Sequence, residues 1–144
     1  MLTAMTLEYW NTLANQTLMV SSLLSGFSIT VVANLLVADK KSKIMDSILK
    51  LATISAGCFL VSVFAMTQIS MMTTAGGTLK ITTTNDFLVP RVIGVSTFMI
   101  GLFSLSAILS LSGWVKSRRT GIFTTIVGIV TLLFIFSTMV RIHL

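Results

Sequence analysis

The side chains able to do chemistry are few in this sequence, and their positions do not form a reaction centre. The single histidine, His143, is the penultimate residue, and the single cysteine, Cys58, lies within an apolar stretch and cannot form an intrachain disulfide. Neither has partners at the spacing of a nucleophile–base pair or of a metal site, and there is no glycine-rich phosphate loop. We therefore expect a protein that is not an enzyme and that holds no metal or cofactor.

Among the polar side chains within or beside the apolar stretches, we single out Asn34, Gln68 and Arg91. Asn34 can coordinate a cation through its carbonyl oxygen or bond a neighbouring helix, but it has no charge with which to select divalent cations. We expect Gln68 to bond another helix, and Arg91 to reach the lipid headgroups or to pair with Asp86. No apolar stretch contains an acid, which disfavours a proton-driven exchanger.

Small and polar residues recur at every fourth position of the first apolar stretch, as Ser22, Gly26, Thr30 and Asn34. We interpret them as one face of a helix, with bulky apolar residues on the remaining surface. Small residues allow helices to approach closely, and hydroxyls add hydrogen bonds between helices. The spacing leaves a second interpretation open, in which this face lines a narrow water-filled path with Asn34 as its most polar point.

The elements that must position these side chains are four apolar stretches, at about residues 17–38, 47–72, 92–114 and 121–142. The chain is 54% hydrophobic and 10% charged, with a mean hydropathy of +0.98. A helix of about 20 such residues crosses the hydrocarbon core of a bilayer and closes its backbone hydrogen bonds internally. We predict an all-α integral membrane protein, with residues 1–144 forming a single four-helix transmembrane domain in a plasma or inner membrane.

The connections predict how the helices are arranged. Residues 39–46 and 116–120 are short, so each joins two antiparallel neighbours, giving two helical hairpins. Residues 1–15 carry Tyr9 and Trp10, which suit a membrane interface, and predict a short interfacial helix leading into the first span. A frayed terminus is the alternative. Pro90 is expected to open the third helix at its first turn.

The formal net charge of +6 does not indicate nucleic-acid binding, because the basic residues do not form one patch. Most of them lie in or beside the two short connections: Lys40, Lys41, Lys43, Lys50, Lys116, Arg118 and Arg119. The positive-inside rule then predicts that both connections are cytoplasmic and that both termini face outward. Membrane lipids are the expected partners of these basic residues.

Residues 22–27 (SLLSGF) resemble the start of the pore helix in Orai-type calcium channels, and residues 64–66 and 69–70 are similar to the second span of that family. The resemblance implies a four-span protein that assembles as an oligomer around its first helices. Asn34 stands where the family has an acidic selectivity residue, so calcium selectivity is not implied. The family's termini are cytoplasmic, opposite to the orientation that the charge pattern predicts.

These observations favour a homo-oligomeric pore or channel-like membrane effector that conducts ions. One small four-helix unit has little interior for a solute path, and a path forms more easily between subunits. The first alternative is a non-catalytic accessory subunit that docks into a larger membrane complex. The second is a small transporter, with Asn34, Gln68 and Arg91 as its substrate contacts.

Overall fold

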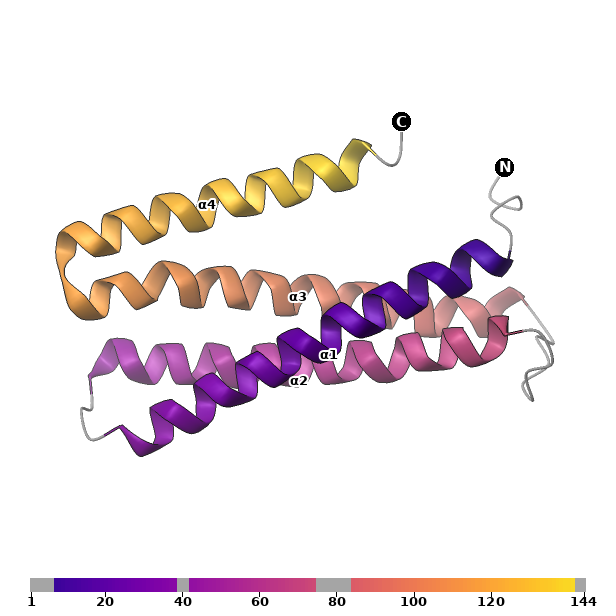
Figure 1. The fold of residues 1–144 in the computed structure, drawn as a ribbon, viewed down its shortest axis with the longest axis horizontal. Coiled ribbons are helices and arrows are strands. Elements are labelled where there is room, and N and C mark those ends of the chain that lie inside the picture. The colour runs from indigo at the N-terminus through magenta and orange to yellow at the C-terminus, as the bar shows by residue number, and fades with distance from the viewer. Residues whose placement is uncertain (1–6, 39–41, 75–83, 142–144) are drawn as a thin grey trace. The chain divides into compact units, whose positions relative to one another are not determined.

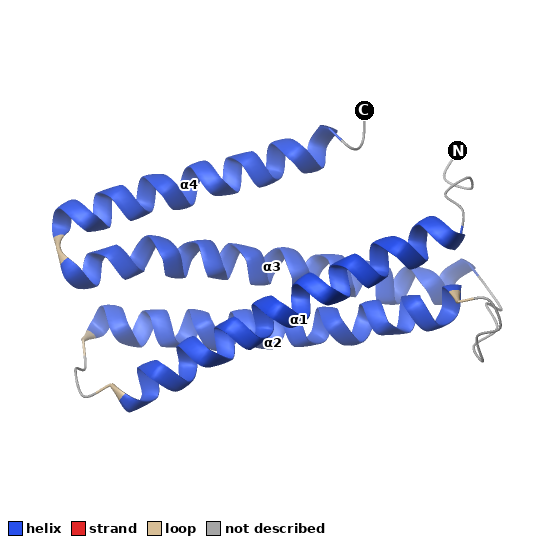
Figure 2. Ribbon diagram, in the orientation of Figure 1, coloured by secondary structure: helices blue, strands red, loops and turns tan. Residues whose placement is uncertain are grey.

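The computed structural model describes residues 7–38, 42–74 and 84–141, and the regular elements in these ranges are all α-helices (Figure 2). In chain order they are α1 (Leu7–Val37), α2 (Lys43–Thr73), α3 (Thr84–Lys116) and α4 (Arg118–Arg141), coloured along the chain in Figure 1. Each of the four is long and apolar enough to cross a membrane. The predicted all-helical class and its four helices of spanning length are therefore confirmed.

The helices extend beyond the apolar stretches. α1 begins at Leu7, so the amino-terminal segment from there on is helical, but it continues into the first apolar stretch without a break. α3 begins at Thr84, which places Pro90 in the second turn of the helix, so the prediction that Pro90 opens the first turn is wrong. A helix can continue past an apolar stretch into polar sequence, where side chains or water can bond its terminal backbone groups. The apolar pattern alone does not mark these additional turns.

Serines cap the amino-terminal ends of two of the helices. Ser42 precedes α2, and its Oγ accepts a hydrogen bond from the backbone N–H of Met45 at 3.2 Å. Ser117 separates α3 from α4, and its Oγ accepts one from the N–H of Thr120 at 3.3 Å. Each serine thereby satisfies a backbone donor that the first helical turn leaves without an intrahelical partner. A single residue thus turns the chain from α3 into α4, which run antiparallel (Figure 1).

The chain divides into two compact units. Unit 1 comprises Met1–Phe27 and Ala56–Ile100, and unit 2 comprises Ser28–Ser55 and Gly101–Leu144. The helices α1, α2 and α3 are each divided between the units, with one part in unit 1 and the other in unit 2. α4 belongs to unit 2 alone.

The core of unit 1 is made by its three helical segments. Ala14 of α1 packs with Met66 and Ile69 of α2, and all three are buried. Phe59 of α2 is also buried and meets Phe98 of α3 edge to face, with ring centroids 5.8 Å apart. Burial of these side chains holds the segments together, since apolar contact area is the main source of packing energy in such a core.

The core of unit 2 lies between α1, α2 and α3. Ile48 and Ala52 of α2 are buried against Ile108 of α3, with half-buried aliphatic residues of α1 packed around them. Elsewhere the helices leave large apolar side chains exposed, including Leu23 of α1 and Phe134 of α4. Apolar surface of this extent is typical of a chain that meets lipid or other subunits.

Small residues bring α3 and α4 together within unit 2. A Cβ added at Gly128 would collide with the hydroxyl of Ser110, and one added at Gly113 would collide with the hydroxyl of Thr124. The Thr124 hydroxyl also donates to the backbone carbonyl of Ser110 at 3.1 Å. The missing side chains of the two glycines therefore permit a close approach that a hydrogen bond reinforces.

Candidate functional site

A series of hydrogen bonds connects three helices in the interior of unit 1. Ser21 of α1 and Ser62 of α2 are fully buried, and their hydroxyl oxygens lie 3.3 Å apart. Ser62 also donates to the backbone carbonyl of Gly94 on α3, at 3.2 Å. Because a serine hydroxyl has only one proton to donate, Ser62 accepts from Ser21 when it donates to Gly94. The hydroxyls thus connect α1 to α2 and α2 to α3.

Unit 2 repeats this arrangement with the same residue types. Ser28 of α1 and Ser55 of α2 are fully buried, with hydroxyl oxygens 3.1 Å apart. Ser55 donates to the backbone carbonyl of Gly101 on α3, at 3.4 Å. We call the two sets the hydroxyl layers: Ser21, Ser62 and Gly94 in unit 1, and Ser28, Ser55 and Gly101 in unit 2.

Seven residues separate the corresponding members of the two hydroxyl layers on every helix. Seven residues make almost two turns, so positions seven apart lie on the same side of a helix. On α1 the buried and half-buried residues continue this side at alternating spacings of four and three: Ala14, Leu18, Ser21, Ser25, Ser28, Val32 and Leu35. This alternation is typical of helices packed in the manner of a coiled coil.

The chemistry of the hydroxyl layers is structural. The protons of Ser55 and Ser62 are directed at backbone carbonyls, and no acid, histidine or amine in the described residues contacts either hydroxyl. A Cβ added at Gly94 would lie 2.9 Å from Cε of Met66, so glycine allows α3 to come within reach of Ser62. One further buried serine of unit 1, Ser25, has no hydrogen-bond partner for its hydroxyl among the described residues.

The face that we predicted from the every-fourth spacing is not the side of α1 that packs within the chain. Ser22, Gly26, Thr30 and Asn34 are all exposed, and we call them the exposed row. A Cβ added at Gly26 would meet no atom within 4 Å. Each step of four residues rotates by about 400°, so the row drifts about 40° per step around the helix. Only the four–three alternation stays on one side, and that side carries the buried serines.

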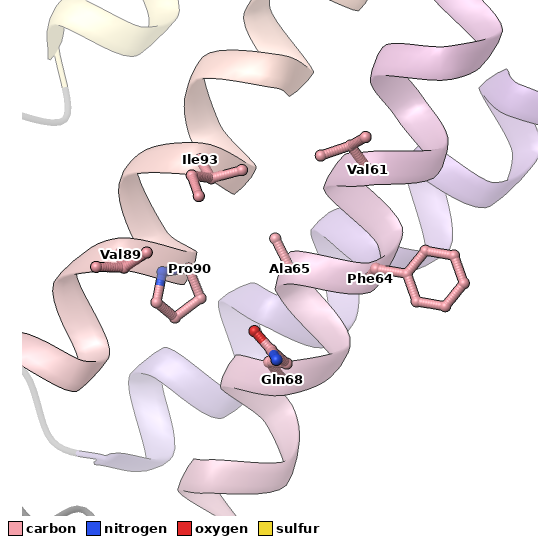
Figure 3. Close-up of a pocket in the computed structure, with 7 residues that line it drawn as sticks. All are labelled: Val61, Phe64, Ala65, Gln68, Val89, Pro90 and Ile93. Atoms are coloured by element: carbon pink, nitrogen blue, oxygen red, sulfur yellow. The ribbon is translucent and has the colours of Figure 1, made fainter.

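Gln68 lies on the exposed surface of unit 1 and lines a shallow cavity of about 310 Å³ (Figure 3). The other lining residues are apolar and come from α2 and α3: Val61, Phe64, Ala65, Val89, Pro90 and Ile93. Gln68 is therefore the one polar side chain among the residues that line this apolar groove. Its predicted bond to another helix is not among the contacts of the described residues.

Arg91 contacts an aromatic ring that the sequence did not connect with it. Its guanidinium carbon lies 4.2 Å from the ring centroid of Trp10, on α1. The side chain of Asp86, the other predicted partner, lies outside the described residues. Arg91 therefore meets α1, whereas Gln68 lines the groove beside Pro90, and the described contacts do not join the two into a substrate site.

Four basic residues of unit 2 lie at or near helix ends and are exposed: Lys43, Lys116, Arg118 and Arg119. We call these four the basic end. Nearby, Lys50 forms an ion pair with Asp46 one turn earlier, at 2.7 Å. Lys40 and Lys41, which we also assigned to this end, lie outside the described residues. The four described side chains thus leave their charges available to solvent or to lipid headgroups.

Among the described residues there is no group of histidine, cysteine and acidic side chains that could hold a metal ion. No protein family, curated protein or solved structure shows a significant match to this chain. Its function must therefore be argued from its own residues. These are the two hydroxyl layers, the exposed row, the groove that Gln68 lines, the basic end, and Arg91 with its contact to Trp10.

Proposed function

We propose that this chain is a four-span protein of a plasma or inner membrane, whose copies assemble through α1 and enclose a pore. The observation that carries the proposal is the exposed row. Its four positions face away from the core of the chain, while α1 uses its buried serines for internal packing. Because these positions are exposed, a neighbouring copy or water can contact them.

A bilayer makes such a row costly unless something covers it. Hydrocarbon offers no hydrogen-bond partners, so the exposed carboxamide of Asn34 gains from a second helix or from a water-filled path. Gly26 has no side chain, and the space around its added Cβ is open, so the backbone of another helix can approach there. Both features favour contact between α1 and a helix of another copy.

A path between copies is favoured over one within a copy. The hydroxyl layers and apolar cores occupy the contacts between α1, α2 and α3, and one 144-residue chain offers little interior for a solute path. Closed oligomers place equivalent surfaces around a symmetry axis, where identical rows can form a lining. The resemblance of residues 22–27 to an Orai-type pore helix supports the same placement of α1. The row has no charge, so discrimination among ions should be weak.

Assembly is tested by measuring the mass of the intact complex in mild detergent and by cysteine cross-linking. In a Cys58→Ala background, Gly26→Cys should form disulfide-linked dimers in membranes. Ile54→Cys, an exposed position on α2, is the matched control and should cross-link much less. A monomeric mass, or equal cross-linking of the two variants, would contradict assembly through α1. A discrete complex with a different protein would instead support the accessory-subunit alternative.

Conduction is tested by ion flux in reconstituted vesicles. Asn34→Asp should raise cation preference, because it adds a fixed negative charge to the lining, and Asn34→Leu should lower flux by drying the constriction. Gln68→Leu removes a polar group outside the exposed row and should leave flux unchanged. Absence of flux from a correctly assembled wild type at any voltage would leave the exposed row as a packing surface only.

A further inference from the structure

Among the described residues, Arg91 of unit 1 has an aromatic partner and no acidic one. Arg91 is half-buried, and its guanidinium lies over the ring of Trp10 at 4.2 Å. An attraction of this kind holds the cation in place without neutralising it. The ion pair of the described residues joins Asp46 to Lys50 in unit 2, and no described carboxylate pairs with Arg91.

The surroundings of Trp10 have the character of a membrane interface. The amide of Asn11 donates to three oxygens at the end of α2: the carbonyl of Ser70 and the hydroxyls of Thr73 and Thr74, at 3.0 to 3.3 Å. Tyr9 lies edge to face with Trp10, with ring centroids 6.2 Å apart. Tryptophan and tyrosine are enriched at the headgroup level of a membrane, where an amphipathic side chain meets water at one end and hydrocarbon at the other. The hydroxyl and amide groups beside Trp10 suit the same level.

The direction of the Arg91 side chain agrees with this depth. Side chains of a helix tilt toward its amino terminus, and α3 begins seven residues before Arg91. A long basic side chain near the end of a span reaches toward the interface in this way, while its methylene stem stays in the apolar region. If α3 spans the bilayer as proposed, this direction brings the guanidinium to the level of the lipid phosphates.

The chemistry of the guanidinium defines what it can hold. It has five N–H donors in one plane, and attraction between its charge and a single aromatic ring does not require all five. Paired oxygens of a phosphate or carboxylate match the edge of that plane. We infer that Arg91, held over Trp10, binds the phosphate of a membrane phospholipid and prefers a headgroup with net negative charge. The inference needs α1 and α3 to span the bilayer, as in the proposed function, but does not need a pore.

Tryptophan fluorescence tests this site directly, because the chain has two tryptophans and Trp114→Phe leaves Trp10 alone. The probes are vesicles of brominated phosphatidylcholine and of brominated phosphatidylglycerol, in which bromine quenches nearby tryptophan. Phosphatidylglycerol should quench Trp10 more strongly, with an enrichment of about fivefold over phosphatidylcholine, the ratio expected for one basic residue beside an anionic surface. Arg91→Gln should bring the two lipids to equal quenching.

Matched variants separate this site from charge in general. Arg119→Gln removes one positive charge at the basic end and should retain the preference of Trp10 for phosphatidylglycerol. Arg91→Lys should retain part of it, because an ammonium binds phosphate as a point charge without the planar fork. If Arg91→Gln does not fold, the wild-type protein still tests the inference: intact-mass measurement during delipidation should show phosphatidylglycerol lost last.

Four outcomes would overturn the inference. Equal quenching by the two lipids in wild type would show that Arg91 selects no anionic headgroup, as would occur if an acid of its own chain or of another copy neutralised it. An unchanged preference in Arg91→Gln would place the lipid elsewhere. A Trp10 emission change produced by inorganic phosphate in lipid-free detergent would identify a site for free anions. Absence of quenching by either lipid would contradict the membrane placement itself, and with it the proposed function.

Discussion

At the scale of single residues, the buried polar side chains of the described residues are serines. A buried hydroxyl is costly in an apolar interior unless it is bonded, and Ser21, Ser28, Ser55 and Ser62 all have partners. Two of these four donate across to the carbonyl of a glycine on the next helix. Their small side chains allow close helix approach while the hydroxyls fix which residues face each other.

The first prediction concerns Ser62, which bonds both Ser21 and Gly94. Ser62→Ala should destabilise the chain by roughly 1–2 kcal/mol, because it removes two interhelical hydrogen bonds and leaves the Ser21 hydroxyl without its partner. Ser22→Ala is the control, since its exposed hydroxyl bonds only the Leu18 carbonyl of its own helix. Helicity followed through unfolding in sodium dodecyl sulfate measures both variants. Equal stability of the two would mean that the hydroxyl layer contributes nothing.

At the scale of elements, the helices use glycine in two different ways. Gly128 of α4 lies against Ser106 and Ser110 of α3, so its missing side chain is needed for the fold of unit 2. Gly26 of α1 faces open space within the chain, so its missing side chain matters only if another molecule approaches. The same residue type therefore predicts opposite consequences of substitution in the two helices.

The second prediction compares these glycines. Gly128→Leu should destabilise the isolated chain by about 1–3 kcal/mol or more, because the added side chain overlaps α3. Gly26→Leu should leave the stability of the isolated chain nearly unchanged and disrupt the oligomer. Unfolding in detergent measures the first effect, and the mass of the intact assembly measures the second. Loss of chain stability in Gly26→Leu with assembly retained would contradict the outward role of this face.

At the scale of the whole molecule, charge is distributed unevenly along the chain. The basic end gathers four exposed cations in unit 2, whereas unit 1 has Glu8 and the ring-bound Arg91 among its described charged groups. For a chain that spans a membrane, the positive-inside rule predicts from this difference that the basic end is cytoplasmic and that both chain termini face outward.

The third prediction is this orientation. In a Cys58→Ala background, Glu8→Cys should react with a membrane-impermeant thiol reagent on intact cells, and Arg119→Cys should react only after the cells are opened. These positions are exposed and, unlike Ser42 and Ser117, do not cap a helix. Labelling of Arg119→Cys on intact cells would reverse the topology. Replacing Lys116, Arg118 and Arg119 with glutamine should make the orientation mixed, because it removes the charge asymmetry.

The sequence by itself determined the four helices, because apolar length and the absence of acids within each stretch are local properties of the chain. A helix before the first apolar stretch was predicted, but not that it continues into α1 without a break, and the start of α3 at Thr84 was not predicted. The polar residues at these ends break the apolar pattern without ending the helix.

Tertiary structure alone decided which side of α1 packs within the chain. Ser21 and Ser22 are adjacent and chemically identical, and the choice between them depends on Ser62, 41 residues away. The same holds for Arg91, whose aromatic partner Trp10 lies on another helix. The length of an apolar stretch depends only on residues that are neighbours in the sequence. A hydrogen bond or ring contact between helices depends on two segments that are distant in the sequence. Only the packing of α1 against α2 and α3 settles which residues those are.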